Sequence, residues 1–292
     1  MDLLDLFKEE ARIPSPPEVF YRFKEAVEDP DTSFEELGDI VASDLGLTAR
    51  LLKIVNSPFY GFSNQVETIA HAISIIGSSQ LNDLVLSTCI IDRFKDVPQK
   101  ALDMQLFWEH SIACGLASKI IANHLDLVNP NSIFVAGLLH DIGRLVICVN
   151  APAAFSEVFL RAQNSQFLFE GTSKAKSLLQ AENEILGFGH DQAGEELLKR
   201  WNLPKVHQEA VGHHHNPIDT PLFEKEATIV NVANNIVQSL SLGCSGELLV
   251  EKVSNQILES LGINDDGFIH TISEEVQLQY QNTIETFLQT AD

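Results

Sequence analysis

Basic residues are scarce in this sequence. Its 292 residues include 19 Lys and Arg against 41 Asp and Glu, which gives a formal net charge of −22. Such a surface repels phosphate backbones and anionic lipid headgroups, and no Lys/Arg run creates a basic patch that would reverse this locally. The charge balance therefore argues against nucleic acid and against a membrane as partners.

Long apolar runs are also absent. The longest, such as Leu145 to Val149, are far shorter than the roughly 20 apolar residues of a membrane-spanning helix. The sequence begins MDLLDLFKEE, with acidic residues where a secretory signal needs positive charge. We therefore expect a cytoplasmic protein.

Cysteine is sparse, and its spacing excludes the common paired-thiol motifs. Cys89, Cys114, Cys148 and Cys244 are isolated from one another, and no C-x-x-C pair occurs. We interpret all of them as small buried hydrophobic residues in a reducing compartment.

What the sequence does contain is apolar periodicity near about 3.6 residues, without a long alternating pattern. This predicts an all-α protein, and a few short strands are also compatible with the pattern. The expected helices are 18–27, 33–43, 47–55, 68–76, 81–94, 103–125, 131–148, 173–186, 190–201, 205–214 and 225–241, with one or two more in 244–292. The polar segment 95–100, which contains Pro98, is the best candidate boundary between subdomains.

Histidines cluster in the second half of the chain. His140 and Asp141 are adjacent within an apolar run flanked by Gly143, and burying two such polar groups requires partners. Neutral imidazoles and carboxylates are suitable ligands for Fe, Mn, Zn or Ni, and a carboxylate can bridge two ions. The other candidates are His110, His190 and His213-His214-His215.

Four segments carry a resemblance to known families. GLLHDIGRL (137–145) resembles the central motif of the HD-superfamily metal phosphohydrolases. IPSPPEV (13–19), ASDLGLTARLLKIVNSPFYG (42–61) and TIAHAISIIG (68–77) resemble the HDOD family, the HD-related output domain of bacterial signalling proteins. The resemblance runs from about residue 10 to about residue 240. The positions that carry its first half are Asp44, Leu47, Thr48, Asn56, Ser57 and Gly77.

The resemblance implies a helical bundle in two subdomains. We expect an N-terminal HDOD subdomain (1–97), an HD-like subdomain (98–243) and C-terminal helices (244–292) that pack on the HD-like part. It also implies a site for one or two divalent transition metal ions. By the order of the HD motifs, its ligands are His110, His140, Asp141, His190, His214 and His215.

Two departures from the phosphohydrolase pattern stand out. Asn234 occupies the place of the last metal-binding Asp, so a His110/His140/Asp141 site would be weakened, whereas a second site formed by Asp141 and the later histidines would be less affected. The G-Y-P segment of the HD-GYP branch is missing, which argues against cyclic di-GMP hydrolysis. Arg144 keeps a positive charge near a phosphate, where related motifs have Lys.

Two hypotheses follow. The favoured one is a cytoplasmic regulatory protein that acts through protein partners in a signalling pathway, with the His/Asp cluster as a structural element or as a metal or nucleotide sensor. The alternative is a metal-dependent phosphohydrolase of a nucleotide or other phosphoester. There Asp141 would orient an activated water and Arg144 would compensate the phosphate charge.

Several other residues receive plainer interpretations. The acidic runs Glu182 to Glu184 and Glu195-Glu196 are read as solvated helix faces. Asp44 and Thr48 are expected to cap a helix, and Asn56-Ser57 is either a ligand-binding turn or a capped helix end. His213 is read as a helix-end residue, and the histidines interpreted as surface or packing residues are His71, His124 and His207.

Overall fold

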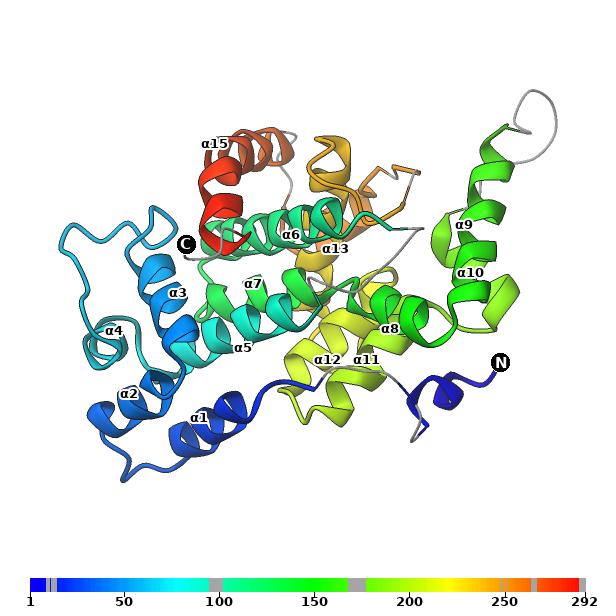
Figure 1. The fold of residues 1–292 in the computed structure, drawn as a ribbon. Helices are drawn as coiled ribbons and strands as arrows, with labels where there is room; N and C mark the ends of the chain where they lie inside the picture. Colours follow the sequence, from blue (N-terminus) through cyan, green and yellow to red (C-terminus); the bar gives the residue numbers. More distant parts are fainter. Residues whose placement is uncertain are drawn as a thin grey trace. The chain divides into compact units, whose positions relative to one another are not determined.

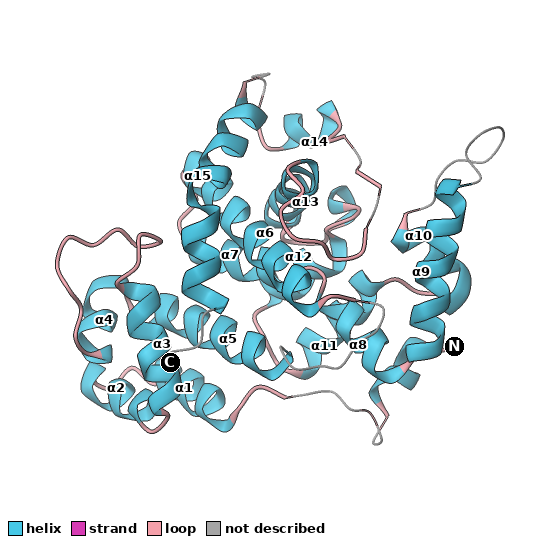
Figure 2. Cartoon of the chain, turned by 45° about the horizontal axis from the view of Figure 1, so that its top comes forward, coloured by secondary structure: helices cyan, strands magenta, loops and turns pink. Residues whose placement is uncertain are grey.

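A computed structural model describes residues 1–8, 11, 15–94, 102–167, 177–247, 249–250, 252–263 and 267–288, without the side chains of 164–167. Within these residues every regular element is a helix and no strand occurs (Figure 2). The predicted all-α fold is therefore confirmed. The expected boundary at 95–100 and the predicted helical residues 173–176 lie outside the described residues.

The chain forms two compact units. The larger contains Met1–Ile13 and Val97–Ser273, and the smaller contains Pro14–Asp96 and Glu274–Asp292. This division differs from the expected 1–97, 98–243 and 244–292 at both ends of the chain. The first residues group with the larger unit, and the residues from Glu274 onward group with the smaller one.

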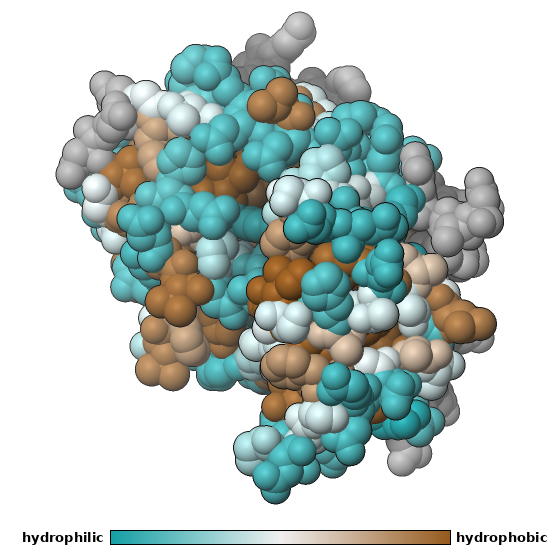
Figure 3. All heavy atoms as spheres, turned by 90° about the vertical axis from the view of Figure 1, so that its left-hand side faces the viewer, coloured by the Kyte–Doolittle hydropathy of each residue, from teal (hydrophilic) through white to brown (hydrophobic). Residues whose placement is uncertain are grey.

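In the smaller unit, α5 packs against α1 and α3, and α2 packs against α4 (Figure 1). The helices of this unit are α1 (Glu18–Glu28), α2 (Phe34–Ala42), α3 (Leu45–Val55), α4 (Ile69–Ile76), α5 (Ser78–Phe94) and most of α15 (Phe268–Leu288). On the face shown in Figure 3, hydrophilic residues predominate and apolar residues lie in separate patches.

Side-chain caps set the ends of these helices. The predicted cap by Asp44 is found, whereas the hydroxyl of Thr48, its predicted partner, donates to the carbonyls of Val41 and Asp44 at 3.0 and 2.9 Å and caps no backbone N–H among the described residues. Ser33 Oγ accepts from the backbone N–H of Glu36 at 3.2 Å, and Glu36 accepts in return from the Ser33 N–H at 2.8 Å. Asp44 accepts from the N–H of Leu47 at 3.0 Å at the start of α3. At the end of α3, Asn56 donates to the carbonyl of Leu52 at 2.8 Å. Of the two readings of Asn56-Ser57, these contacts match the capped helix end.

In the larger unit, α6 packs against α7 and α13, and α11 packs against α8 and α12 (Figure 1). Its helices are α6 (Met104–His124), α7 (Pro130–Leu139), α8 (Ile142–Asn150), α9 (Pro152–Phe167), α10 (Leu178–Leu186), α11 (His190–Arg200), α12 (Lys205–His213), α13 (Glu224–Ser239) and α14 (Asn255–Ser260), with the 3-10 helices η1 (Leu3–Phe7) and η3 (Pro217–Asp219).

The predicted single helix over 131–148 is wrong. The chain breaks at His140-Asp141, which separates α7 from α8. Side chains of adjacent residues on a straight helix diverge by about 100°. The break removes this constraint, so both side chains can face one centre. Helix α9 is a further difference, because the periodicity of 152–167 did not lead us to expect it.

The stretch Pro130–Asn150, which comprises α7 and α8, is long and apolar enough to cross a membrane by length and composition alone. Its most apolar window is 89% buried inside the protein, which is typical of core helices as well. It is therefore weak evidence for a membrane span.

Candidate metal centre

His140 lies at the α7–α8 break with its side chain fully buried. Its Nδ1 donates to the carbonyl of Gly137 at 2.8 Å. In the neutral imidazole this leaves Nε2 with a free lone pair, and Nε2 has no hydrogen-bond partner among the residues that the structure describes. A histidine held in this way by a backbone carbonyl is typical of metal ligands.

His214 repeats the arrangement at the end of α12. Its Nδ1 donates to the carbonyl of Val211 at 2.7 Å, and within the described part of the chain its buried Nε2 has no hydrogen-bond partner. The side-chain amide of Asn231 donates to the backbone carbonyl of His214 at 2.7 Å, which fixes this turn against α13. Two histidines therefore present unpartnered Nε2 atoms to the interior of the larger unit.

His190, the first residue of α11, is oriented by a carboxylate. Its Nδ1 donates to Glu182 at 2.6 Å, and its backbone N–H donates to the same oxygen at 2.8 Å. Burial alone would lower the pKa of His190, but Glu182 and Asp141 outweigh it and raise this pKa to about 9. The interpretation of Glu182 as part of a solvated face is wrong, because this residue is 1% exposed.

The remaining predicted ligands complete the cluster. His110 comes from α6, with its Nε2 3.9 Å from Asp141 Oδ2, and burial lowers its pKa to about 3. His215 is half-buried, with its Nε2 3.0 Å from that of His190. All six residues predicted as ligands therefore lie together, although their sequence positions span more than a hundred residues.

Asp141 lies at the centre of the cluster. Its Oδ1 is 3.0 Å from His190 Nε2, and its Oδ2 is 3.2 Å from His140 Nε2. Neither oxygen accepts a well-aligned hydrogen bond from any described residue. Burial would raise the pKa of Asp141, but Arg144 and His140 hold it well below its usual value. The carboxylate is thus ionised, and it forms an ion pair with Arg144 and lies close to the ring nitrogens of His140 and His190.

Arg144 is the cation beside this carboxylate. Its Nε lies 3.2 Å from Asp141 Oδ1, and one terminal nitrogen donates to the carbonyl and the hydroxyl of Ser245 at 2.8 and 2.9 Å. The side chain is 1% exposed. Its guanidinium therefore already contacts Asp141 and Ser245 of the protein itself.

Glycine at position 143 permits the close approach of α8 and α11. A Cβ on Gly143 would collide with the carbonyl oxygen of His190 and would lie 2.5 Å from the backbone nitrogen of Gly194. Only a residue without a side chain fits at this crossing. The contact holds His190 next to Asp141.

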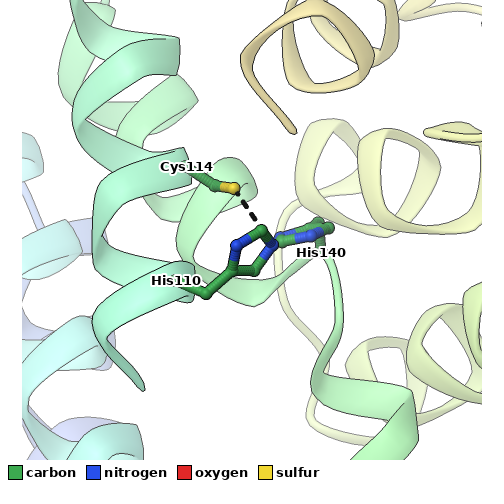
Figure 4. Close-up of side chains that lie close together, drawn as sticks. All are labelled: His110, Cys114 and His140. Carbon is green, nitrogen blue, oxygen red and sulfur yellow. Dashed lines mark hydrogen bonds between the residues drawn. The ribbon is translucent and has the colours of Figure 1, made fainter. Parts of the chain in front are cut away.

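Two further residues at the cluster escaped the sequence interpretation. Cys114, one turn after His110 on α6, has its Sγ 3.5 Å from His110 Nε2 (Figure 4). Glu182 is the second. The signal for Cys114 was its four-residue spacing from His110, and the signal for Glu182 was its position between Leu178 and Leu186 on the buried face of α10.

These donors suit a transition metal. Three groups of side chains have their ligand atoms within 4.8 Å of one another: His110, Cys114 and His140; His140, Asp141 and His214; and His190, His214 and His215. Imidazole, carboxylate and thiol groups are ligands of Zn, Fe and related ions. Because the Nε2 atoms of His140 and His214 are buried without partners, the residues present fit a bound ion.

Comparison with known proteins agrees with the fold. The family model of the HDOD domain matches residues 13–217. The structure is similar to an HDOD domain protein of unknown function from Geobacter sulfurreducens, with a TM-score of 0.77, 25% identity and 98% of each chain covered. It is also similar to a proposed phosphohydrolase of Shewanella amazonensis SB2B, with a TM-score of 0.71, 21% identity and 98% of each chain covered. The second likeness shows the fold alone.

A protein of Treponema pallidum (strain Nichols), described as uncharacterized, is 24% identical over 272 residues. The match covers 92% of this chain and 50% of that protein. The chain therefore spans about half the length of the curated relative that it matches.

Proposed function

Because this chain belongs to the HDOD family, we propose that it is a cytoplasmic regulatory protein that holds a divalent transition metal in the buried cluster and acts through protein partners. His140, Asp141 and His214 would hold the ion, with His190 and His110 beside them. A bound ion would supply positive charge to Asp141 and join α6, the α7–α8 break, α11 and α12.

The observation that carries this proposal is the burial of the donor atoms. His140, Asp141, His190 and His214 are each 0% exposed. A phosphoester substrate would have to reach these groups from solvent, and the guanidinium of Arg144 is already engaged by Asp141 and Ser245. Such an arrangement favours a structural or sensing role over turnover.

A metal-dependent phosphohydrolase acting on a nucleotide or other phosphoester is the second candidate. It is supported by the half-buried His215, through which the cluster approaches the surface. In that case Asp141 would orient the attacking water, and Arg144 would have to leave Ser245 to meet the phosphate. A small nucleotide could equally bind there as a signal without being cleaved.

Metal analysis of anaerobically purified protein, paired with a phosphodiesterase screen, separates the two candidates. We expect bound metal in the wild type, its loss in His140→Ala, and no turnover in either. His207→Ala is the matched control, because His207 is also buried but hydrogen-bonds Ser132 at 3.0 Å instead of joining the cluster. Turnover that disappears in His140→Ala and Asp141→Ala would overturn the regulatory proposal.

A further inference from the structure

We propose that Cys114 is a thiolate ligand of the metal centre and replaces the carboxylate that is missing at Asn234. With His110 and His140 it would form a sulfur-containing arm of the site. This inference rests on the proposed function, since it requires that the cluster binds a metal.

Cys114 lies where a ligand of the cluster would have to lie. His110 and Cys114 are four residues apart on α6 and therefore project from the same side of the helix. Their ligand atoms and a ring nitrogen of His140 lie within 4.8 Å of one another. Figure 4 shows the three side chains side by side. Helices α6 and α7 approach closely here: a Cβ added to Gly137 would lie only 2.7 Å from the carbonyl oxygen of Cys114.

The buried ring of His140 presents a nitrogen that a metal ion could bind. The ring is 0% exposed, and its Nε2 forms no hydrogen bond with a described residue although Asp141 Oδ2 is 3.2 Å away. In the neutral form of the ring, in which Nδ1 holds the proton that Gly137 accepts, the lone pair of Nε2 faces the negative carboxylate. Two electron-rich atoms in this position are stabilised by a cation that both can bind.

The side chain beside the Cys114 thiol is a neutral amide. Cys114 Sγ is 3.8 Å from the side-chain oxygen of Asn234, which is 5% exposed on α13. An amide is neutral, so Asp141 alone would balance a divalent ion on this side of the cluster. Burial raises the pKa of the Cys114 thiol well above its usual value, so a bound ion would have to displace the thiol proton to solvent. The resulting thiolate would supply the second negative charge from an atom that already lies beside the amide.

The inference predicts which metals the protein selects. Thiolate ligands favour Zn²⁺ and other borderline or soft ions, whereas sites of carboxylate and carbonyl oxygens favour Mn²⁺ and Mg²⁺. A site with Cys114 should therefore prefer Zn²⁺ over Mn²⁺. The Cys114→Ala variant should lose most of this preference.

The test replaces the metal with Co²⁺ in the full-length chain, because a thiolate on cobalt gives an intense near-ultraviolet charge-transfer band. We expect the band in the wild type and in Cys148→Ala, a control for another fully buried cysteine of the same unit. We expect cobalt to remain bound to Cys114→Ala without the band, and with affinity weaker by at least about tenfold, which is the loss typical when a residue that only supports a ligand is removed.

The outcomes separate this inference from the proposed function. Cys114 is not a ligand if the wild type binds cobalt without a charge-transfer band, or if the band survives in Cys114→Ala. Either result would still agree with a metal centre formed by the other residues. Failure of the wild type to bind Co²⁺, Zn²⁺ or Fe²⁺ overturns the proposed function itself.

A double variant tests the replacement directly. Asn234→Asp, added to Cys114→Ala, should recover the lost affinity without recovering the band, because a carboxylate then takes the position of the thiolate. A double variant that is folded by circular dichroism but binds Co²⁺ no better than Cys114→Ala contradicts the replacement.

Discussion

Replacing Glu182 with Gln should destabilise the metal-free protein in a pH-dependent way. Glu182 accepts from both the ring and the backbone of His190, and this pair is buried. The pKa of His190 rises from 6.5 to about 9, with Glu182 as the largest favourable cause. Gln keeps an oxygen that can accept the ring proton, so the substitution removes the charge and little else.

The size of the effect follows from the pKa of His190. The rise from 6.5 to about 9 corresponds to roughly 3 kcal/mol between the two protonation states. Because the folded-state pKa is raised, this stabilisation is fully present below about pH 6.5 and is lost as the pH rises through about 9. Glu182→Gln should therefore cost about 2 to 3 kcal/mol at pH 6 and much less at pH 10.

Urea denaturation of the chelator-treated protein at several pH values measures this difference. Glu184→Gln, on the same helix but with a side chain that is 42% exposed, is the control and should change the free energy of unfolding by less than about 0.5 kcal/mol. If Glu182→Gln and the wild type are equally stable at pH 6, the proposed coupling of Glu182 to His190 is wrong.

Three further substitutions test other parts of the account. Gly143→Ala should destabilise the protein by about 1 to 3 kcal/mol and weaken metal binding, because its Cβ collides with His190. The control is Gly46→Ala, whose Cβ meets only Asp44 Oδ1 at 3.5 Å, and which should change stability little. Arg144→Met should lower the free energy of unfolding of the metal-free protein by about 3 to 5 kcal/mol, because it leaves Asp141 without its cation. Zn²⁺ should then raise the Tm of this variant more than that of the wild type. Equal Tm shifts would show that Arg144 does not balance the charge of Asp141. Asp44→Ala should lower stability by about 1 kcal/mol through the lost cap of α3 and leave metal binding unchanged, as titration of both proteins would show.

Local signals predicted most of the helices. Ser33 with Glu36 is a capping box that can be read directly from the chain, and Thr68 caps α4 through the N–H of His71 at 3.1 Å. The break inside 131–148 could not be read in this way. His140 and Asp141 interrupt an apolar run that is otherwise compatible with one helix, and their position depends on contacts with α11 and α12.

The order of the HD motifs along the chain predicted which residues are ligands. It did not predict which other side chains surround them. The acidic run at 182–184 hid Glu182, because the pattern does not distinguish a carboxylate on a solvated face from one buried against His190. Cys114 was hidden for the opposite reason, since a buried cysteine in an apolar helix is ordinarily a packing residue. Its contact with His110 depends on how α6 meets α7.

Anomalous X-ray scattering from crystals of the zinc-loaded protein, recorded on both sides of the zinc edge, tests the central claim most directly. The account predicts one strong peak within bonding distance of His140 Nε2, His214 Nε2 and a carboxylate oxygen of Asp141. Crystals that show zinc only at surface residues, with these three groups bound to no metal, would contradict it.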